Sequence, residues 1–553
     1  MSEEPASPVD GASIAPLARG LYRLLLALSL ITLAAHVIRL VHIQVLWDDG
    51  YIFQRYARHL MAGQGLSWQP DGPPVYGLTA LLYVLPAALC LLVTREPSAA
   101  AMLASVASGV VFVGAAGWLL WRFVPGPRGA RAAGLLLSAA AVAASSTPVH
   151  FASGMDTTFG LAFQAVYFMV AVRFARRPAR AQAIHLGIVG ALALWVRPEL
   201  LAFSIMLPAA MAVRPPPGDG HPRRRALEAL AATGAGVLVI LTANALYFGM
   251  PLPLPFYAKT FSPYLGGLRA AYRGVGVEHL IIFAGHYWPL LAIIAAELLG
   301  RPRRWWHRAD GLILGTLAAS FVVGAYHSLF ALPVMAMSER FLQVLVVPLA
   351  YLASRVIADV WPTLAFRRQR AKPRPRWGLA VVGLAGVGLW LGPVAAKELT
   401  QANRHLARSR VRWDVVAHAA DDGPRSYWFE MDAFLEMPAD FSIASTEVGM
   451  LGIVHPNKRI IDLAGLNEPR FARSPLEPEV LLGEMRPDLL YMPHQDYGPM
   501  VEAIRTHPLF ANYVHLDKRR ARTRAFGVAL RRDSPYFAQM KRIAGIEPRK
   551  KKR

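Results

Sequence analysis

Long apolar runs separated by short basic loops dominate the chain from residue 21 to residue 395. A run of about 20 apolar residues is long enough to cross the hydrocarbon core of a bilayer as a helix. Arg197-Pro198-Glu199 interrupts one run, which therefore predicts two short spans rather than one. The runs of spanning or near-spanning length are 21–43, 76–94, 100–123, 131–150, 158–174, 184–213, 227–248, 278–299, 311–330, 340–361 and 378–395.

The pattern changes near residue 400, where the long apolar runs stop. Short strand-like stretches then alternate with helical ones, which predicts a small α/β domain. The predicted strands are Phe441–Ser445, Arg459–Leu463, Asp488–Met492 and Phe526–Leu530. We therefore expect a cytoplasmic tail over 1–20, a transmembrane module over 21–398 with an outer loop at 44–75, an extracytoplasmic α/β domain over 399–540 and a basic tail over 541–553.

Composition agrees with a mainly α, polytopic membrane protein. Of the 553 residues 54% are hydrophobic and the mean hydropathy is +0.33, which is too apolar for a soluble protein of this size. The net charge is +23, but the arginines gather in short loops, which indicates membrane topology and not a nucleic-acid-binding surface. Cys90 is the only cysteine, which excludes an intrachain disulfide and a thiolate metal cluster. Residues 1–18 are polar and no cleavage site follows the first run, so we expect no cleavable signal.

The arginine-rich loops predict the orientation, because basic loops stay in the cytoplasm. They lie at residues 122–131, 173–180, 214–225, 301–308 and 367–376. If all five are cytoplasmic, one of the two apolar runs between Asp49 and Arg122 does not cross. The run 76–94 follows Pro73-Pro74, and we expect it to be interfacial or re-entrant. This predicts about eleven transmembrane helices in a bacterial cytoplasmic (inner) membrane, with the N-terminus cytoplasmic and the C-terminal domain outside.

A charged stretch follows the first apolar run, and it begins with the pair Asp48-Asp49. Charges beside hydrocarbon must be paired, hydrated or used. An interfacial cap, in which one aspartate caps a short helix, is the alternative. The predicted topology places further polar segments on the same outer face, and that convergence favours a membrane-embedded active site. These segments are residues 153–156, 197–199, 248–259 and 337–340.

Outward carboxylates together with basic residues suit glycosyl transfer from a lipid-linked phosphosugar. A carboxylate can take the proton of an acceptor hydroxyl while Arg or Lys stabilises the charge that grows on the departing phosphate. No Gly-rich nucleotide-binding loop is present in the sequence. A transporter or flippase of lipid-linked glycans is the alternative, but a translocation route needs polar residues at mid-depth in the membrane.

Several motifs resemble, in order, those of GT-C glycosyltransferases, most closely the mycobacterial arabinofuranosyltransferases that use decaprenyl-phosphoryl-arabinose. Asp-Asp-Gly-Tyr-Ile at 48–52 resembles the first outer loop, and Ser-Gly-Met-Asp-Thr at 153–157 resembles Ser-Gly-Leu-Glu-Thr. Arg-Pro-Glu at 197–199, Tyr-Phe-Gly at 247–249, Pro-Phe-Tyr-Ala-Lys at 255–259 and Arg-Phe-Leu at 340–342 follow. Glu447-Val448-Gly449 and residues 461–466 resemble segments of the outer C-terminal domain.

The resemblance implies a GT-C module whose active site opens outward beneath the C-terminal domain. Asp48 or Asp49 would be the catalytic carboxylate, with a preference for Asp48, and Asp156 would be a second acidic residue of the catalytic site that orients the acceptor or assists. The implied substrate-binding residues are Arg55, Arg58, Arg197, Glu199, Tyr257, Lys259 and Arg340, of which Lys259 and Arg340 would bind the donor phosphate.

The implied partners are a polyprenyl-phosphate sugar donor, a glycan, lipid or protein acceptor, and membrane lipids. The sugar would be arabinofuranose or another pentose or hexose. No metal ligands are assigned and no cofactor is implied with certainty, although two outward acidic positions could ligate a divalent metal. The sequence departs from the family's pattern twice: Asp156 replaces the usual Glu, which keeps the charge but shortens the side chain, and Leu254-Pro255 replaces Asn-Thr, which bears on the donor sugar.

Each assignment has a structural alternative. Asp156 precedes an apolar run and could cap a helix. Lys259 and Arg340 could extend to lipid headgroups. Arg197 and Glu199 are too close in sequence to pair on one helical face, so they could stabilise a turn. We expect structural roles for His36, His150, His286 and His327, and loop-holding roles for Glu447 and Asp462.

Overall fold

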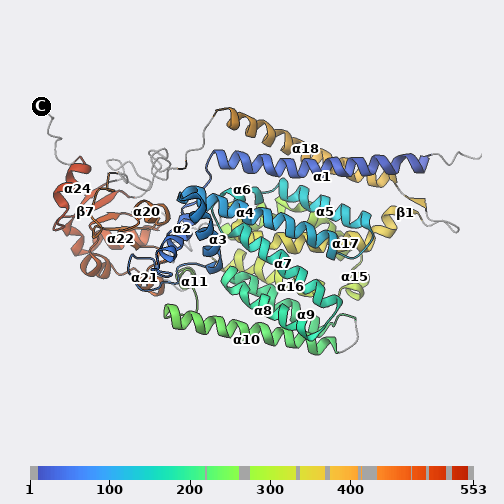
Figure 1. Ribbon diagram of the computed structural model, residues 1–553, viewed down its shortest axis with the longest axis horizontal. Helices are drawn as coiled ribbons and strands as arrows, with labels where there is room; N and C mark the ends of the chain where they lie inside the picture. Colours follow the sequence, from blue (N-terminus) through green and yellow to red (C-terminus); the bar gives the residue numbers. More distant parts are fainter. Residues whose placement is uncertain are drawn as a thin grey trace, which may run out of the picture.

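The computed structural model shows long helices lying side by side, with a small α/β unit at one end of the bundle (Figure 1). Helices α1 (Asp10–His42) and α18 (Trp377–Arg408) run along one side, and α10 (Pro222–Phe248) lies on the opposite side. The described residues are 10–217, 221–260, 274–331, 337–367, 374–375, 377–408, 413, 433–474, 476–493, 497–517 and 526–545. Of the predicted basic tail 541–553, residues 546–553 lie outside them.

Seven helical segments in the described ranges are long and apolar enough to cross a membrane. They are Ala18–His42, Pro97–Phe123, Thr157–Arg176, Pro222–Phe248, Gly311–Phe330, Met337–Trp361 and Val381–Ala407. Their outer faces are apolar: Leu238, Val239 and Leu246 of α10 are 66, 68 and 83% exposed. Such a surface would be anomalous in water and is suited to lipid, so the chain is a helical membrane protein as predicted.

Shorter helices fill the bundle between these segments. They are α3 (Val84–Thr94), which follows the 3₁₀ turn η1 (Leu81–Tyr83), α5 (Arg128–Ala143), α6 (Thr147–Ala152), α8 (Arg180–Val196) and α9 (Leu201–Val213). The predicted break between α8 and α9 is present. Arg197 is extended (φ −163°, ψ 121°), because the residue before a proline avoids the helical region, and η3 (Pro198–Leu200) follows it.

The apolar run 278–299 is bent, although its sequence predicts one continuous span. Helices α13 (Val275–His286) and α14 (Trp288–Gly300) meet at an angle of 89°. Pro289 in the first turn of α14 lacks an N–H and cannot continue the hydrogen bonding of α13. The Tyr287 hydroxyl at the bend hydrogen-bonds the hydroxyls of Ser145 (2.9 Å) and Thr147. Counting this pair as one span gives up to eight.

The remaining elements either make up four of the spanning segments named above or connect them. Two of them, α2 and α11, lie beside the C-terminal unit (Figure 1). The spanning elements are α4 (Pro97–Trp118) with η2 (Leu119–Phe123), α7 (Thr157–Arg176), α16 (Gly311–Ala325) with η4 (Tyr326–Phe330), and η5 (Met337–Leu345) with α17 (Val346–Ala365). The connecting elements are α2 (Asp48–Met61), α11 (Leu254–Thr260), α15 (Pro302–Arg308) and the short strands β1 (Phe366–Arg367) and β2 (Arg374–Pro375).

The C-terminal unit contains a five-stranded sheet of order β4-β3-β5-β7-β6. Strands β3 (Ser442–Ser445), β4 (Arg459–Asp462), β5 (Leu489–Tyr491) and β7 (Val528–Arg531) lie within one or two residues of the predicted strands, and β6 (Tyr513–Leu516) adds an edge that the sequence analysis missed. Strands β4, β3 and β5 are parallel to one another, and β7 pairs antiparallel with both of its neighbours, β5 and β6. Its helical elements are α20 (Gly449–Val454), α21 (Pro469–Arg473), η7 (Val480–Met485), α22 (Gly498–Thr506), η9 (Pro508–Asn512) and α24 (Phe537–Ile543).

The arginine-rich loops gather at the end of the bundle opposite the C-terminal unit. Arg176 donates to the Phe123 carbonyl (2.6 Å), which joins two of these loops. Arg214 donates to the carbonyls of Trp306 (2.6 Å) and Ala309 (2.8 Å), which joins two more. Phe123, Arg176, Pro216 and Asp310 line one common cavity, so these two pairs of loops lie together, as the positive-inside pattern predicts.

We expect a cysteine at Asp71, in the exposed loop after α2, to react with an impermeant thiol reagent added outside intact cells. A cysteine at Arg128, at the start of α5 on the arginine-rich face, should react only after the membrane is opened. Both cysteines are introduced in a Cys90→Ser background, because Cys90 is the only native cysteine and its removal leaves the introduced thiol as the only one that can react. Labelling of position 128 in intact cells would contradict the proposed orientation.

Candidate active site

Helix α2 carries the paired aspartates in its first turn, where negative charge interacts favourably with the helix dipole. Trp47 precedes it in an extended conformation (φ −96°, ψ 147°). The Trp47 N–H donates to the Ser153 carbonyl (3.1 Å), which ties the start of α2 to the segment that carries Asp156. Adjacent residues on a helix point about 100° apart, so Asp48 and Asp49 face different surroundings.

Asp48 binds the C-terminal unit. Its carboxylate accepts hydrogen bonds from the N–H groups of Gly449 (2.8 Å) and Met450 (2.7 Å) at the start of α20. A Cβ at Gly449 would lie 1.8 Å from the Asp48 carbonyl oxygen, so only glycine fits there. Burial raises the pKa of Asp48 to about 6, while the two N–H donors act in the opposite direction. Asp48 thus joins the membrane helices to the C-terminal unit.

Asp49 faces the bundle and pairs with Arg340. The Arg340 Nη1 lies 3.3 Å from Asp49 Oδ2, and its Nη2 lies 3.1 Å from Asp156 Oδ1. The Asp156 side chain is almost fully buried, whereas that of Asp49 is 17% exposed. One guanidinium therefore holds together three segments that are far apart in the sequence.

Arg197 and Glu199 extend this network. Arg197 Nη1 lies 3.6 Å from Asp156 Oδ2, and Nη2 lies 2.5 Å from Glu199 Oε1. The two residues pair across the 3₁₀ turn at Pro198, not on a helical face, so their closeness in sequence does not prevent the contact. Acidic and basic groups therefore alternate in the order Asp49, Arg340, Asp156, Arg197, Glu199.

Lys259 completes the cluster from α11. Its Nζ lies 5.3 Å from the centre of the Phe341 ring, and the Arg340 guanidinium lies 5.6 Å from the same ring. Burial lowers the pKa of Lys259 to about 8, and the nearby Asp49 carboxylate partly offsets that shift. The His327 ring stacks on Phe341 with centroids 5.3 Å apart. Two cations thus share one aromatic platform.

Arg55 and Arg58, expected to bind substrate, instead contact the C-terminal unit. The buried Arg55 guanidinium donates to the carbonyls of Trp68 (2.8 Å) and Gly452, and to those of His455 (3.2 Å) and Lys458 (3.1 Å). Arg58 donates to the Ile453 carbonyl (3.4 Å). Tyr257 lies beside the cluster on α11, and the Arg473 guanidinium of α21 sits 5.9 Å from its ring centre.

The sequence analysis expected structural roles for His150 and His286 but did not connect these residues with Arg340. Ser338 and Glu339, directly before it, both have left-handed backbone angles (φ 52°). Glu339 pairs with His286 (3.3 Å), and His150 contacts the Ser338 carbonyl. The position of His150 in the sequence, six residues before Asp156, was the available signal, but a polar residue beside an apolar run is more often structural.

Among the described residues, no three His, Cys, Asp or Glu side chains lie close enough together to hold a metal ion. The acidic groups of the cluster instead face arginines: Asp49 and Asp156 face Arg340, and Glu199 faces Arg197. The donor set of this cluster therefore does not fit a divalent cation, which needs several free oxygen ligands.

No protein-family model matches the chain, and no curated protein matches its sequence. Solved structures do match its backbone. The apo crystal structure of ArnT from Cupriavidus metallidurans aligns with a TM-score of 0.50 at 13% identity, covering 91% of this chain and 97% of ArnT. The chain has a GT-C fold. This overlay confirms the fold class that the ordered motifs implied.

Two further structures are similar at lower scores. ArnT bound to undecaprenyl phosphate aligns with a TM-score of 0.49 at 13% identity, covering 93% of this chain and 98% of ArnT. The arabinosyltransferase EmbB from Mycobacterium smegmatis aligns with a TM-score of 0.35 at 12% identity, covering 69% of this chain and 40% of EmbB.

We expect Arg55→Met to destabilise the protein, because each buried carbonyl left without a donor costs about 1–3 kcal/mol. The apparent Tm in detergent should fall by about 3 °C or more. Arg58→Met, on the same helix, removes one long hydrogen bond and should shift the apparent Tm by about 1 °C at most. Equal shifts of the apparent Tm in the two variants would contradict the stabilising contacts assigned to Arg55.

The raised pKa of Asp48 predicts a pH dependence of stability. A carboxyl whose pKa rises from 3.8 to about 6 on folding binds more protons in the folded state, so its contribution to stability is lost as pH rises through that window. Asn cannot ionise, and the difference in apparent Tm between wild type and Asp48→Asn should therefore fall between about pH 4 and pH 6 and then level off. Differential scanning fluorimetry checks this, and a constant difference would refute it.

Proposed function

We propose that the chain is a membrane glycosyltransferase that moves a sugar from a polyprenyl-phosphate donor to an acceptor on the outer face of the bacterial cytoplasmic membrane. The observation that carries this proposal is the contact of Arg340 with both Asp49 and Asp156, with Lys259 beside it. These groups lie where the membrane helices meet the C-terminal unit. A carboxylate next to two cations is the arrangement that transfer from a phosphosugar requires.

Asp49 is the better candidate for the base. Both oxygens of Asp48 accept backbone hydrogen bonds, whereas Asp49, whose side chain is 17% exposed, pairs with Arg340. The acceptor oxygen forms a bond to the anomeric carbon while the bond from that carbon to the phosphate oxygen breaks. The acceptor proton passes to Asp49, and the electron pair of the broken bond stays on the phosphate.

Arg340 and Lys259 would bind the donor phosphate. Three carboxylates (Asp49, Asp156, Glu199) balance three cations (Arg197, Arg340, Lys259), so an arriving phosphate adds negative charge to a neutral cluster. Asp156, itself paired with Arg197, then holds the Arg340 side chain in place while the contact of Arg340 with Asp49 loosens. Charge that develops on the leaving phosphate is stabilised by groups already in position.

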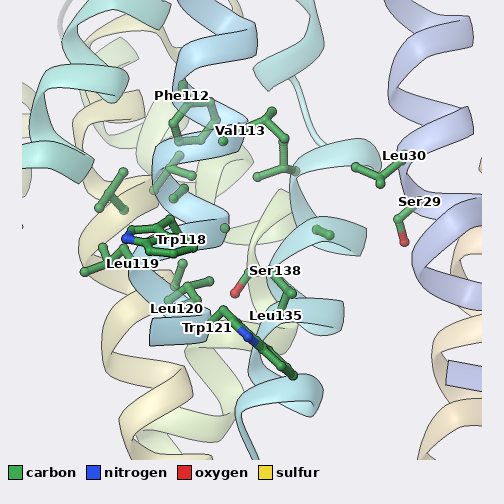
Figure 2. Close-up of a pocket in the computed structure, with 18 of the residues that line it drawn as sticks. Ser29, Leu30, Phe112, Val113, Trp118, Leu119, Leu120, Trp121, Leu135 and Ser138 are labelled. Atoms are coloured by element: carbon green, nitrogen blue, oxygen red, sulfur yellow. The ribbon is translucent and has the colours of Figure 1, made fainter. Parts of the chain in front are cut away.

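An apolar cavity between α1, α4, α5 and α17 could hold the lipid chain of the donor. Its volume is about 380 Å³, and Leu30, Phe112, Trp118 and Leu135 line it (Figure 2). Val346 and Val347 line the same cavity six and seven residues beyond Arg340. ArnT, whose fold this chain shares, binds undecaprenyl phosphate in a crystal structure. The motif resemblance points to arabinofuranose or another pentose or hexose as the sugar.

We expect Asp49→Asn to lower sugar transfer about 10²- to 10⁴-fold, the usual contribution of a general base. Asp156→Asn should also lower transfer, because Arg340 loses its buried partner. Asp71→Asn, in an exposed loop, is the matched control and should transfer at the wild-type rate. The assay follows a labelled polyprenyl-phosphate sugar in proteoliposomes.

The products decide between the two candidate classes. A transferase releases free polyprenyl phosphate, and a flippase moves the labelled lipid across the bilayer unaltered. Transfer by Asp49→Asn at the wild-type rate would refute the role of Asp49, and lipid movement without sugar transfer would refute the proposed function.

A further inference from the structure

His150 is part of the segment that carries Asp156, and it contacts the two segments that carry Asp49 and Arg340. It lies on α6, six residues before Asp156. We propose that His150 is the positioning residue that fixes the geometry of these three groups. Its catalytic consequence rests on the proposed function, but its structural consequence does not.

The first contact is with the segment that leads into α2. The His150 ring meets the ring of Trp47 edge to face, with centroids 5.5 Å apart and planes at 90°. Aromatic pairs prefer this arrangement, in which the positive edge of one ring meets the negative face of the other. Trp47 directly precedes Asp48 and Asp49, so the contact fixes where α2 begins.

The second contact is with the turn that leads into Arg340. His150 Nε2 lies 2.9 Å from the Ser338 carbonyl oxygen. A carbonyl can only accept, so Nε2 carries the proton and donates it. The other ring nitrogen, Nδ1, is buried without a hydrogen-bond partner among the described residues, which agrees with a neutral ring.

This hydrogen bond acts on a strained turn. Ser338 (φ 52°, ψ 42°) and Glu339 (φ 52°, ψ 32°) are consecutive non-glycine residues in the left-handed region. Such conformations persist only where their surroundings hold them. Gln343 Nε2 also donates to the Ser338 carbonyl (3.3 Å), and His286 pairs with Glu339 (3.3 Å). Without the shorter bond from His150 the turn can relax, and the Arg340 side chain that follows it moves relative to Asp49.

The third link is covalent. His150 and Asp156 lie on one buried segment, in which the Ser153 hydroxyl donates to the His150 carbonyl (3.3 Å) and the Trp47 N–H donates to the Ser153 carbonyl (3.1 Å). A shift of about 1 Å in such a site can lower a reaction rate about 10²-fold. A single imidazole therefore sets the relative position of a base and the cation beside it.

Two substitutions separate positioning from packing. His150→Phe keeps an aromatic ring against Trp47 but removes the donor to Ser338. His150→Gln keeps an amide donor but removes the ring. We expect Phe to lower kcat for sugar transfer about 10- to 100-fold and Gln to retain a rate within about fivefold of wild type. If His150 only filled space in the core, His150→Gln would lower kcat more than His150→Phe, and that result would overturn the proposal.

A stability cycle tests the same contact without any transfer assay. Because His150 acts through the turn before Arg340, adding His150→Phe to Arg340→Gln should lower the apparent Tm by less than half of the shift that it causes in wild type. Arg355→Gln, which alters an ion pair with Asp310 at the opposite end of the bundle, is the matched background and should give additive shifts.

The two readouts fail separately. If the wild type transfers no sugar but the cycle shows coupling only with Arg340, the proposed function is wrong and the positioning contact stands. If the wild type transfers sugar and His150→Phe is additive in both backgrounds, the positioning inference is wrong and the proposed function stands.

Discussion

The carboxylate of Asp48 binds two backbone N–H groups of the C-terminal unit, and the direction of α2 depends on this contact. Arg55, two turns further along the same helix, donates to four carbonyls, one of them in α20 (Gly452) and two in the loop that follows α20 (His455 and Lys458). Buried charges are stable only when their hydrogen bonds are made, so these two residues fix the rotation of α2 about its axis. That rotation turns Asp49 toward Arg340.

The alternating charges from Asp49 to Glu199 contribute little to the stability of the fold. Burying an ion pair removes water from both partners, and replacement by apolar side chains of similar size is often neutral or stabilising. Five alternating charges and Lys259 at this depth are therefore better explained by chemistry than by folding. The strained turn at Ser338 and Glu339 supports this view, because left-handed non-glycine residues concentrate at functional sites.

Sequence patterns predicted the helical membrane bundle and four of the five strands of the C-terminal sheet, because spanning length and apolar strand cores leave direct signals. The edge strand β6 has only a weak sequence signal, since His515 interrupts its short apolar stretch. The bend at Tyr287 has almost no sequence signal, because apolar residues continue on both sides and Pro289 is tolerated in the first turn of a helix. Charge parity placed Asp156, Lys259 and Arg340 on one face, and the structure brings these three together with Asp49.

The choice between Asp48 and Asp49 was beyond the sequence for a physical reason. Two neighbouring residues on a helix differ by about 100° in direction, and only the rotation of the helix decides which one faces the bundle. The contacts that set this rotation lie about 400 residues away, at Gly449 and Gly452, where no motif indicates a partner for α2. Two adjacent carboxyls are thereby placed in different environments, one bound by backbone N–H groups and one beside a guanidinium, which is how a pair of like groups acquires separate roles.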